Sequence, residues 1–168
     1  KVAIAHNPSS NLKLASGIAP VVQLQKAGVQ VSLGTDGAAS NNRLDMFTEL
    51  RTASLLHKVS NQDPTVVPAE MALRMATING ARALGLGDQI GSLEPGKKAD
   101  LILIDLERSH LTPCFNPVSL MVYSARGSDV SDVMVNGQWL VKEGKLVKWD
   151  EHEVCTAAAQ SAKGLLER

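Results

Sequence analysis

The sequence predicts an α/β fold with parallel strands, followed by a smaller, mostly β unit. Three observations support this prediction. Two short apolar segments, residues 2–5 and 29–33, are separated by a helix-prone segment. Further helix-prone segments follow the second apolar run, and this alternation is typical of parallel sheets. After residue 86, glycine and proline separate short β-prone runs, which indicates a different kind of domain.

The composition is that of an ordinary globular domain. The 168 residues are 44% hydrophobic and 20% charged, and the net charge is zero. Nucleic acids and anionic membranes usually attract a basic excess, so we expect neither as a partner. No apolar run approaches the ~20 residues of a membrane-spanning helix. Cys114 and Cys155 lack metal-ligand spacing and favour a reducing, cytoplasmic location.

The first strand, residues 2–5 (Val-Ala-Ile-Ala), is fully apolar, which predicts burial on both faces of a parallel sheet. The polar segment 6–11 (His-Asn-Pro-Ser-Ser-Asn) predicts a loop with turn chemistry. A helix over residues 20–27 has proline at its start and glycine after its end. It leads into the second strand, residues 29–33.

Three more helices are expected before residue 86. They span residues 45–56, 68–76 and 79–84. A loop of small residues, 37–42, precedes the first of them, and Asn42 is expected to be its N-cap. Asp63 or Thr65 is expected to cap the second.

Residues 87–150 predict a small, mostly β unit. The apolar run 100–105 is its first strand. Asn136 and Gly137 lie between β-prone runs, and Asn-Gly is the strongest short signal for a hairpin. Residues 151–168 are rich in alanine and predict a terminal helix that docks on the protein.

Four segments resemble the amidohydrolase superfamily. They are residues 6–14 (His-Asn-Pro-Ser-Ser-Asn-Leu-Lys-Leu), 33–42 (Leu-Gly-Thr-Asp-Gly-Ala-Ala-Ser-Asn-Asn), 76–85 and 91–101. The last two are shared across the superfamily. The first two narrow the resemblance to its deaminase and chlorohydrolase-like branch, in particular to 5′-methylthioadenosine and S-adenosylhomocysteine deaminases.

The resemblance implies a (β/α)8 TIM-like barrel with a small β-sandwich built from both chain ends. Residues 1–86 would be the last two βα units of the barrel, and residues 87–150 the C-terminal part of the sandwich. A complete barrel needs ~250 residues, so we expect this chain to be a C-terminal fragment. Its start at Lys1, directly before a strand, agrees with that expectation.

The metal-binding histidine pair and the acid/base glutamate of the superfamily would lie upstream. The histidines of this chain are His6, His57, His110 and His152. No two of them form a His-x-His pair, and the last three are expected to have surface or packing roles.

Asp36 is the main candidate for a site residue. It follows the second strand directly, and barrel enzymes gather their catalytic groups at the carboxyl ends of strands. By the resemblance, Asp36 is the last ligand of a divalent metal, expected to be zinc. It would also accept a proton from the metal-activated water. The alternative is an aspartate that caps a helix or closes the turn before Gly37.

Candidate substrate contacts cluster after the first strand. They are His6, Asn7, Ser9 and Asn11, together with Asp36, and Ser10 could contribute in the same way. Asn41 is expected to order the loop after Asp36 and not to touch substrate. Their donors and acceptors suit a purine or a ribose. Alternatively, loop backbone holds His6, and the asparagine and serine residues only build turns.

The resemblance implies a parent enzyme that deaminates an adenine nucleoside such as 5′-methylthioadenosine or S-adenosylhomocysteine, as a homo-oligomer. Guanine, cytosine or a triazine remain alternative substrates. In a different class, the chain is a non-catalytic module or the second half of a split enzyme that needs a partner chain. A catalytic zinc needs three or more protein ligands. We therefore expect the chain alone to be inactive, to bind metal weakly and to associate through its open sheet edge.

Overall fold

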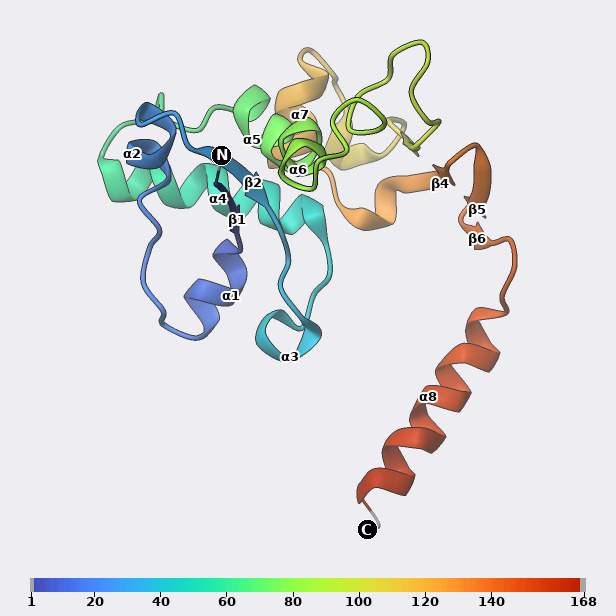
Figure 1. Cartoon of the computed structure of the whole chain (residues 1–168). Coiled ribbons are helices and arrows are strands. Elements are labelled where there is room, and N and C mark those ends of the chain that lie inside the picture. Colours follow the sequence, from blue (N-terminus) through green and yellow to red (C-terminus); the bar gives the residue numbers. More distant parts are fainter. Residues whose placement is uncertain (1, 167–168) are drawn as a thin grey trace.

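The computed structural model describes residues 2–166. The chain begins with strand β1 (Ala3–His6), helices α1 (Pro8–Lys13) and α2 (Val21–Lys26), and strand β2 (Gln30–Leu33). The two strands pair in parallel, with Ala3 opposite Gln30 and His6 opposite Leu33. Parallel strands end at the same edge of a sheet, so the segments that lead to α1 and to α3 leave this edge together (Figure 1).

Both predicted strands are confirmed to within one residue, but the expected burial of the first is wrong. Val2 is 80% exposed, and Ala3 and Ala5 are also exposed. Among the described residues only β2 pairs with β1, so the other edge of β1 is uncovered. In β2, by contrast, Val31 and Leu33 are buried.

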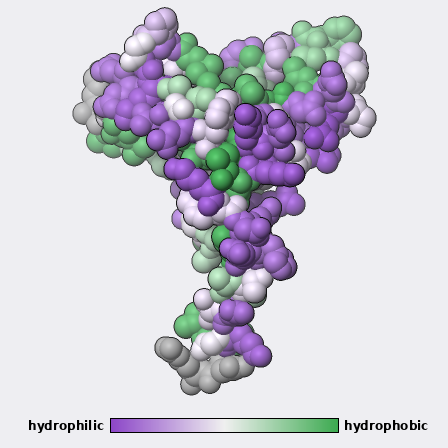
Figure 2. All heavy atoms as spheres, turned by 90° about the vertical axis from the view of Figure 1, so that its right-hand side faces the viewer, coloured by the Kyte–Doolittle hydropathy of each residue, from purple (hydrophilic) through white to green (hydrophobic). Residues whose placement is uncertain are grey.

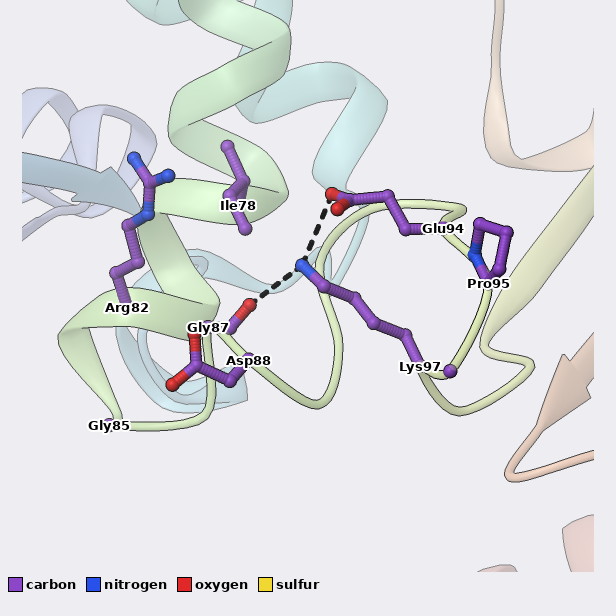
Figure 3. A pocket seen from close by; sticks show the side chains of 9 residues that line it. Ile78, Arg82, Gly85, Gly87, Asp88, Glu94, Pro95 and Lys97 are labelled. Atoms are coloured by element: carbon purple, nitrogen blue, oxygen red, sulfur yellow. Dashed lines mark hydrogen bonds and ion pairs between the residues drawn. The ribbon is translucent and has the colours of Figure 1, made fainter.

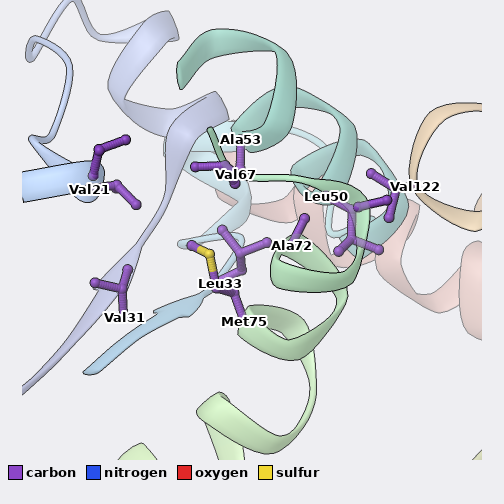
Figure 4. Close-up of a cluster of buried hydrophobic side chains, with 11 residues drawn as sticks. Val21, Val31, Leu33, Leu50, Ala53, Val67, Ala72, Met75 and Val122 are labelled. Atoms are coloured by element: carbon purple, nitrogen blue, oxygen red, sulfur yellow. The ribbon is translucent and has the colours of Figure 1, made fainter. Parts of the chain in front are cut away.

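The main core lies between β2 and the predicted helices that follow it. These are α4 (Met46–Asn61), α5 (Ala69–Ala76) and α6 (Ile78–Ala83). Figure 4 shows Leu33 of β2 meeting Ala53 of α4 and Met75 of α5 in one cluster. Burying one large apolar side chain contributes roughly 1.5–3 kcal/mol, so this cluster holds the helices against the strand.

The predicted helix cap of α4 is wrong. The N-cap is Asp45, whose carboxylate accepts hydrogen bonds from Phe47 N (2.9 Å) and Thr48 Oγ1 (3.0 Å). Asn42 instead adopts a left-handed conformation with φ 65° and ends the short helix α3 (Ala38–Asn41). Asparagine tolerates this conformation better than most residues, which explains its place here.

Two other local predictions are also wrong. Asp63 accepts hydrogen bonds from the N–H and the hydroxyl of Thr65, so neither residue caps α5, and Pro68 precedes that helix. The segments expected to be loops contain the short helices α1 and α3. Proline at the first position of α1 has its φ preset for a helix and needs no N–H partner there.

The predicted β unit forms an antiparallel sheet of four strands in sequence order. They are β3 (Leu101–Ile104), β4 (Val130–Val135), β5 (Gln138–Lys142) and β6 (Lys145–Leu146). The Asn-Gly hairpin is confirmed between β4 and β5. Asn136 and Gly137 have φ values of 50° and 76°, the positive values that this tight turn requires.

Helix α7 (Pro117–Tyr123) was not expected in the β-rich part of the chain. It lies between two single-turn helices, η1 (Ser109–Leu111) and η2 (Gly127–Asp129). Its Val122 is buried in the main core, near Leu50 of α4 (Figure 4). The Tyr123 hydroxyl lies 2.7 Å from Ser54 Oγ. The chain after residue 86 therefore returns to pack on the first unit.

The terminal helix is confirmed as α8 (Glu151–Leu166), and residues 167–168 lie outside the described part. It does not dock on the rest of the described chain, because none of its residues is buried. Figures 1 and 2 show it extending away as a narrow arm with polar and apolar residues. Within residues 2–166, no helix combines the length and the apolar character needed to cross a membrane.

Candidate functional site

Asp36 lies just beyond the carboxyl end of β2, with its side chain exposed. Three donors hold its carboxylate. The hydroxyls of Ser40 (2.7 Å) and Ser10 (2.8 Å) both donate to Oδ2, and the N–H of Gly37 donates to Oδ1 at 2.7 Å. The backbone of Asp36 has φ 61°, which is uncommon outside glycine and is maintained only where the surroundings enforce it.

These hydrogen bonds favour the ionised form. The bond from Ser40, then those from Ser10 and Gly37, lower the pKa of Asp36 below its usual value. A carboxylate that stays ionised is well suited to bind a cation, but its low pKa makes it a weak base. The bonds from Gly37 and Ser40 are also those that the alternative, a turn-closing aspartate, would make.

The described residues fit a metal ion only in part. Asp36 offers an oxygen ligand of a type that zinc accepts. Within residues 2–166, however, no three or more histidine, cysteine, aspartate or glutamate side chains are grouped so that they could hold a metal. This part of the chain therefore supplies one candidate ligand and not a complete site.

His6 is buried and is paired with another histidine. Its Nε2 lies 3.0 Å from Nε2 of His57 on α4, so one ring donates to the other. The alternative that loop backbone holds the His6 side chain is wrong. Burial, and secondly the proximity of His57, lowers the pKa of His6 to about 4. Burial also lowers the pKa of His57.

The second ring nitrogen of His6 has no partner. Nδ1 is the one buried side-chain nitrogen or oxygen without a hydrogen bond in the described part of the chain. Leaving a buried polar atom unpaired costs roughly 1–3 kcal/mol, and such an atom calls for an explanation. A ligand or another protein segment that bonds to Nδ1 would remove this cost.

The other candidate residues surround the start of α1. The Asn7 side chain lies against Gly34, where a Cβ would be 2.5 Å from Oδ1, so a larger residue there would displace the Asn7 amide. The N–H of Ser9 donates to a carboxylate oxygen of Glu49. Asn7, Ser9 and Asn11 are all partly exposed. They lie at the same sheet edge as Asp36, although no contact with Asp36 joins them.

Sequence reasoning missed three partners of these residues, Ser40, Glu49 and His57. It named Ser10 as a possible substrate contact and not as a donor to Asp36. The expectation that Asn41 orders the loop after Asp36 agrees with its hydrogen bond to Thr35 O. One signal was present for the two on α4. Glu49 and His57 fall at helical spacing with the apolar residues Leu50 and Ala53. Glu49 therefore stood on the buried face of the helix predicted over residues 45–56, and His57 follows directly after that range on the same face of α4.

A separate polar pocket lies beside α6 (Figure 3). Lys97 crosses it, donates to Gly87 O and Ser92 Oγ, both at 2.7 Å, and pairs with Glu94 at 3.3 Å. None of the predicted site residues lines it. The Lys97 contacts hold the glycine-rich turns together, which indicates a structural role for this segment.

Comparison with known proteins confirms the resemblance. A sequence profile of the amidohydrolase family matches residues 1–140, so the chain belongs to the amidohydrolase family. The chain is 49% identical over 166 residues to the 5-methylthioadenosine/S-adenosylhomocysteine deaminase of Syntrophomonas wolfei, covering 99% of the chain and 38% of that protein. It is 51% identical over 168 residues to the 5′-deoxyadenosine deaminase of Methanosarcina acetivorans, covering 100% of the chain and 38% of that protein.

The fold is also that of a solved metal-containing relative. The crystal structure of an adenosine deaminase from Xanthomonas campestris with bound zinc matches with a TM-score of 0.96 and 43% identity. The match covers 99% of this chain and 38% of that one. The chain thus spans about 38% of the length of each of these relatives.

Proposed function

We propose that this chain is the C-terminal part of a metal-dependent aminohydrolase that deaminates an adenine nucleoside, such as 5′-methylthioadenosine, S-adenosylhomocysteine or 5′-deoxyadenosine. The observation that carries the proposal is the Asp36 carboxylate, held by three donors at the carboxyl edge of a parallel strand pair. The names of the relatives that are about half identical to the chain support the substrate class.

In the proposed architecture, β1 and β2 are the last two strands of a (β/α)8 barrel. Residues 1–86 contribute to the barrel, residues 87–150 to a β-sandwich, and residues 151–168 form the terminal helix. The parallel pairing of β1 and β2 and the antiparallel sheet β3–β6 support this division. The packing of α7 on α4 and α5 joins the two units.

In the proposed mechanism, Asp36 supplies one ligand to a divalent metal, expected to be zinc. When bound, such a metal lowers the pKa of its water toward ~7. The ionised Asp36 would also accept a proton from the attacking water, which would require at least one of its present donors to turn away. His6, Asn7, Ser9 and Asn11 would offer donors and acceptors to the purine or ribose. Asn7, Ser9 and Asn11 are partly exposed, whereas Nδ1 of His6 is buried and unpartnered.

The full-length protein is proposed to be cytoplasmic and to form a homo-oligomer. Both cysteines, Cys114 and Cys155, are free and exposed. Exposed unpaired thiols favour a reducing compartment. The alternatives of a guanine, cytosine or triazine substrate stay predictions, to be separated by the assay below.

The test is Asp36→Asn in the full-length protein that contains this chain. We expect metal content to fall and deaminase activity to drop by more than about 100-fold, because even residues behind the ligands cost 10–100-fold. Ammonia release from the three adenine nucleosides, guanine, cytosine and a triazine identifies the substrate. The matched control is Asp88→Asn, an exposed aspartate on the surface. Full metal content and activity in Asp36→Asn would contradict the proposal.

A further inference from the structure

A buried glutamate lies behind the Asp36 loop. Glu49, in the first turn of α4, is 0% exposed. Its Oε2 accepts the backbone N–H of Ser9 at 3.1 Å, and its Oε1 accepts Asn41 Nδ2 at 2.8 Å. A buried carboxylate is stable only where donors replace water, and each of its oxygens has one such donor here.

These contacts adjoin the groups that hold Asp36. Ser9 precedes Ser10, and Asn41 follows Ser40, so each residue bonded to Glu49 is next in sequence to a serine that donates to the Asp36 carboxylate. Asn41 Nδ2 also donates to the carbonyl oxygen of Thr35 at 2.6 Å, directly before Asp36. The start of α1, the end of β2 and the helix α3 thus converge on one carboxylate.

The conformation of Asp36 needs such support. A non-glycine residue at φ 61° persists only where its neighbours over-determine it. Ser40 and Asp36 are exposed or partly exposed, whereas Glu49 and Asn41 are buried. Glu49, on the long helix α4, is therefore the most rigidly held residue of the network. The segments bonded to it carry Ser10 and Ser40, which hold the exposed Asp36 carboxylate.

We propose that Glu49 is a positioning residue for Asp36. It touches neither substrate nor metal. It holds Ser9 and Asn41, which set the two serines that orient the Asp36 carboxylate. The inference rests on the proposed function only in taking Asp36 as a metal ligand.

The test compares Glu49→Ala and Glu49→Gln with the exposed control Glu70→Ala in the full-length protein. Measurements are zinc loss to a chelator, kcat and KM for the preferred nucleoside, and thermal unfolding. Glu49→Ala should lose zinc faster and show a lower kcat, each by about 10–100-fold, as for other residues that orient metal ligands. Glu49→Gln keeps the size of the side chain and one hydrogen-bond acceptor, so its effect should be smaller. It replaces Glu49→Ala in the comparison if the alanine variant does not fold.

A double-mutant cycle with Ser40→Ala tests whether Glu49 acts through the serines. Coupled residues give non-additive effects, so the double variant should be little worse than the more impaired single variant. Fully additive effects on zinc loss would overturn the proposal. So would a Glu49 variant that unfolds earlier but keeps the zinc loss rate and kcat of the unaltered protein.

Amide hydrogen exchange separates this inference from the proposed function. The Ser9 N–H bonds to Glu49, and the Gly37 N–H bonds to Asp36. Both should exchange faster in Glu49→Ala and as before in Glu70→Ala. If the unaltered protein binds no zinc and deaminates nothing, the proposed function is wrong, while this exchange result still decides whether Glu49 holds the loop. Unchanged exchange at both amides would refute the inference.

Discussion

His6, at the end of β1, and His57, on α4, are joined by one hydrogen bond between their Nε2 atoms. Only one of the two rings can donate, so the pair is satisfied when both are neutral. Protonating both would place donor against donor in a buried position. The charge state of this pair therefore affects the stability of the edge that carries Asp36.

We predict that part of the acid sensitivity of the protein comes from His6. Its pKa is about 4 in the folded chain, against about 6.5 in an unfolded one. As the pH falls, the unfolded state binds the proton first, so the free energy of unfolding decreases between about pH 6.5 and pH 4. The decrease is at most about 3.5 kcal/mol, since one pKa unit corresponds to about 1.4 kcal/mol.

Urea unfolding of the full-length protein at a series of pH values measures this effect. His6→Gln should flatten the curve over that range, leaving a smaller slope from His57. His152→Gln, on the exposed helix α8, should not alter it. Identical slopes for His6→Gln and the unaltered protein would show that His6 is not the titrating group.

At the scale of elements, α4 connects the core to the candidate site. Asp45 caps its first turn, and Leu50 and Ala53 face the main core. Glu49 and His57 face the edge where β1 and β2 end. One helix thus fixes both loops of the site, because a rigid element transmits the packing of its core face to its other contacts.

The turn at Gly91 packs against α6, and we predict that it is intolerant of a side chain. A Cβ there would lie 2.6 Å from Ala81 Cβ and 2.9 Å from Ile78 Cα, and φ is 90°. Gly91→Ala should lower the free energy of unfolding by about 2–4 kcal/mol, from strain and overpacking together.

Gly96→Ala is the matched control. Its φ is 93°, yet no atom lies within 4 Å of the added Cβ. Only backbone strain remains, about 1–2 kcal/mol. Thermal or urea unfolding measures both variants, and equal losses would show that the contacts of Gly91 with α6 do not matter.

On the scale of the whole molecule, the described chain leaves apolar strand surface uncovered. Val2 beside β1 is 80% exposed, and Ile102 and Leu103 of the edge strand β3 are each 47% exposed. Open edges with apolar side chains pair with other chains. In the proposed enzyme, the preceding barrel and sandwich strands would cover these edges.

We therefore predict that residues 1–168 produced alone associate, do not bind zinc stoichiometrically and have no deaminase activity. One aspartate cannot replace the three or more ligands of a catalytic zinc. Light scattering after size-exclusion chromatography and zinc titration by calorimetry measure this, with the full-length protein as control. A monodisperse, zinc-loaded monomer would contradict the prediction.

The sequence by itself determined the longer elements and the leading candidate residue, but not the short helices α1, α3 and α7. Apolar runs indicated β1, β2 and β3, helical periodicity indicated α4, and Asn136-Gly137 indicated the hairpin. Asp36 became the leading candidate because it follows the second strand and because residues 33–42 resemble a segment of the amidohydrolase superfamily. Each of these features depends on residues that are close together along the chain, and local patterns report such features well.

Only the tertiary structure decided which side chains meet. Ser10 and Asp36 are 26 positions apart, Ser9 and Glu49 are 40 apart, and His6 and His57 are 51 apart. The packing of α7, which lies in a β-rich segment, against the main core is also a contact between residues far apart in the sequence. Such contacts depend on the register of β1 and β2 and on the packing of α4 against their edge. Spacing along the chain does not encode that packing, so no local pattern could assign Glu49 to Asp36.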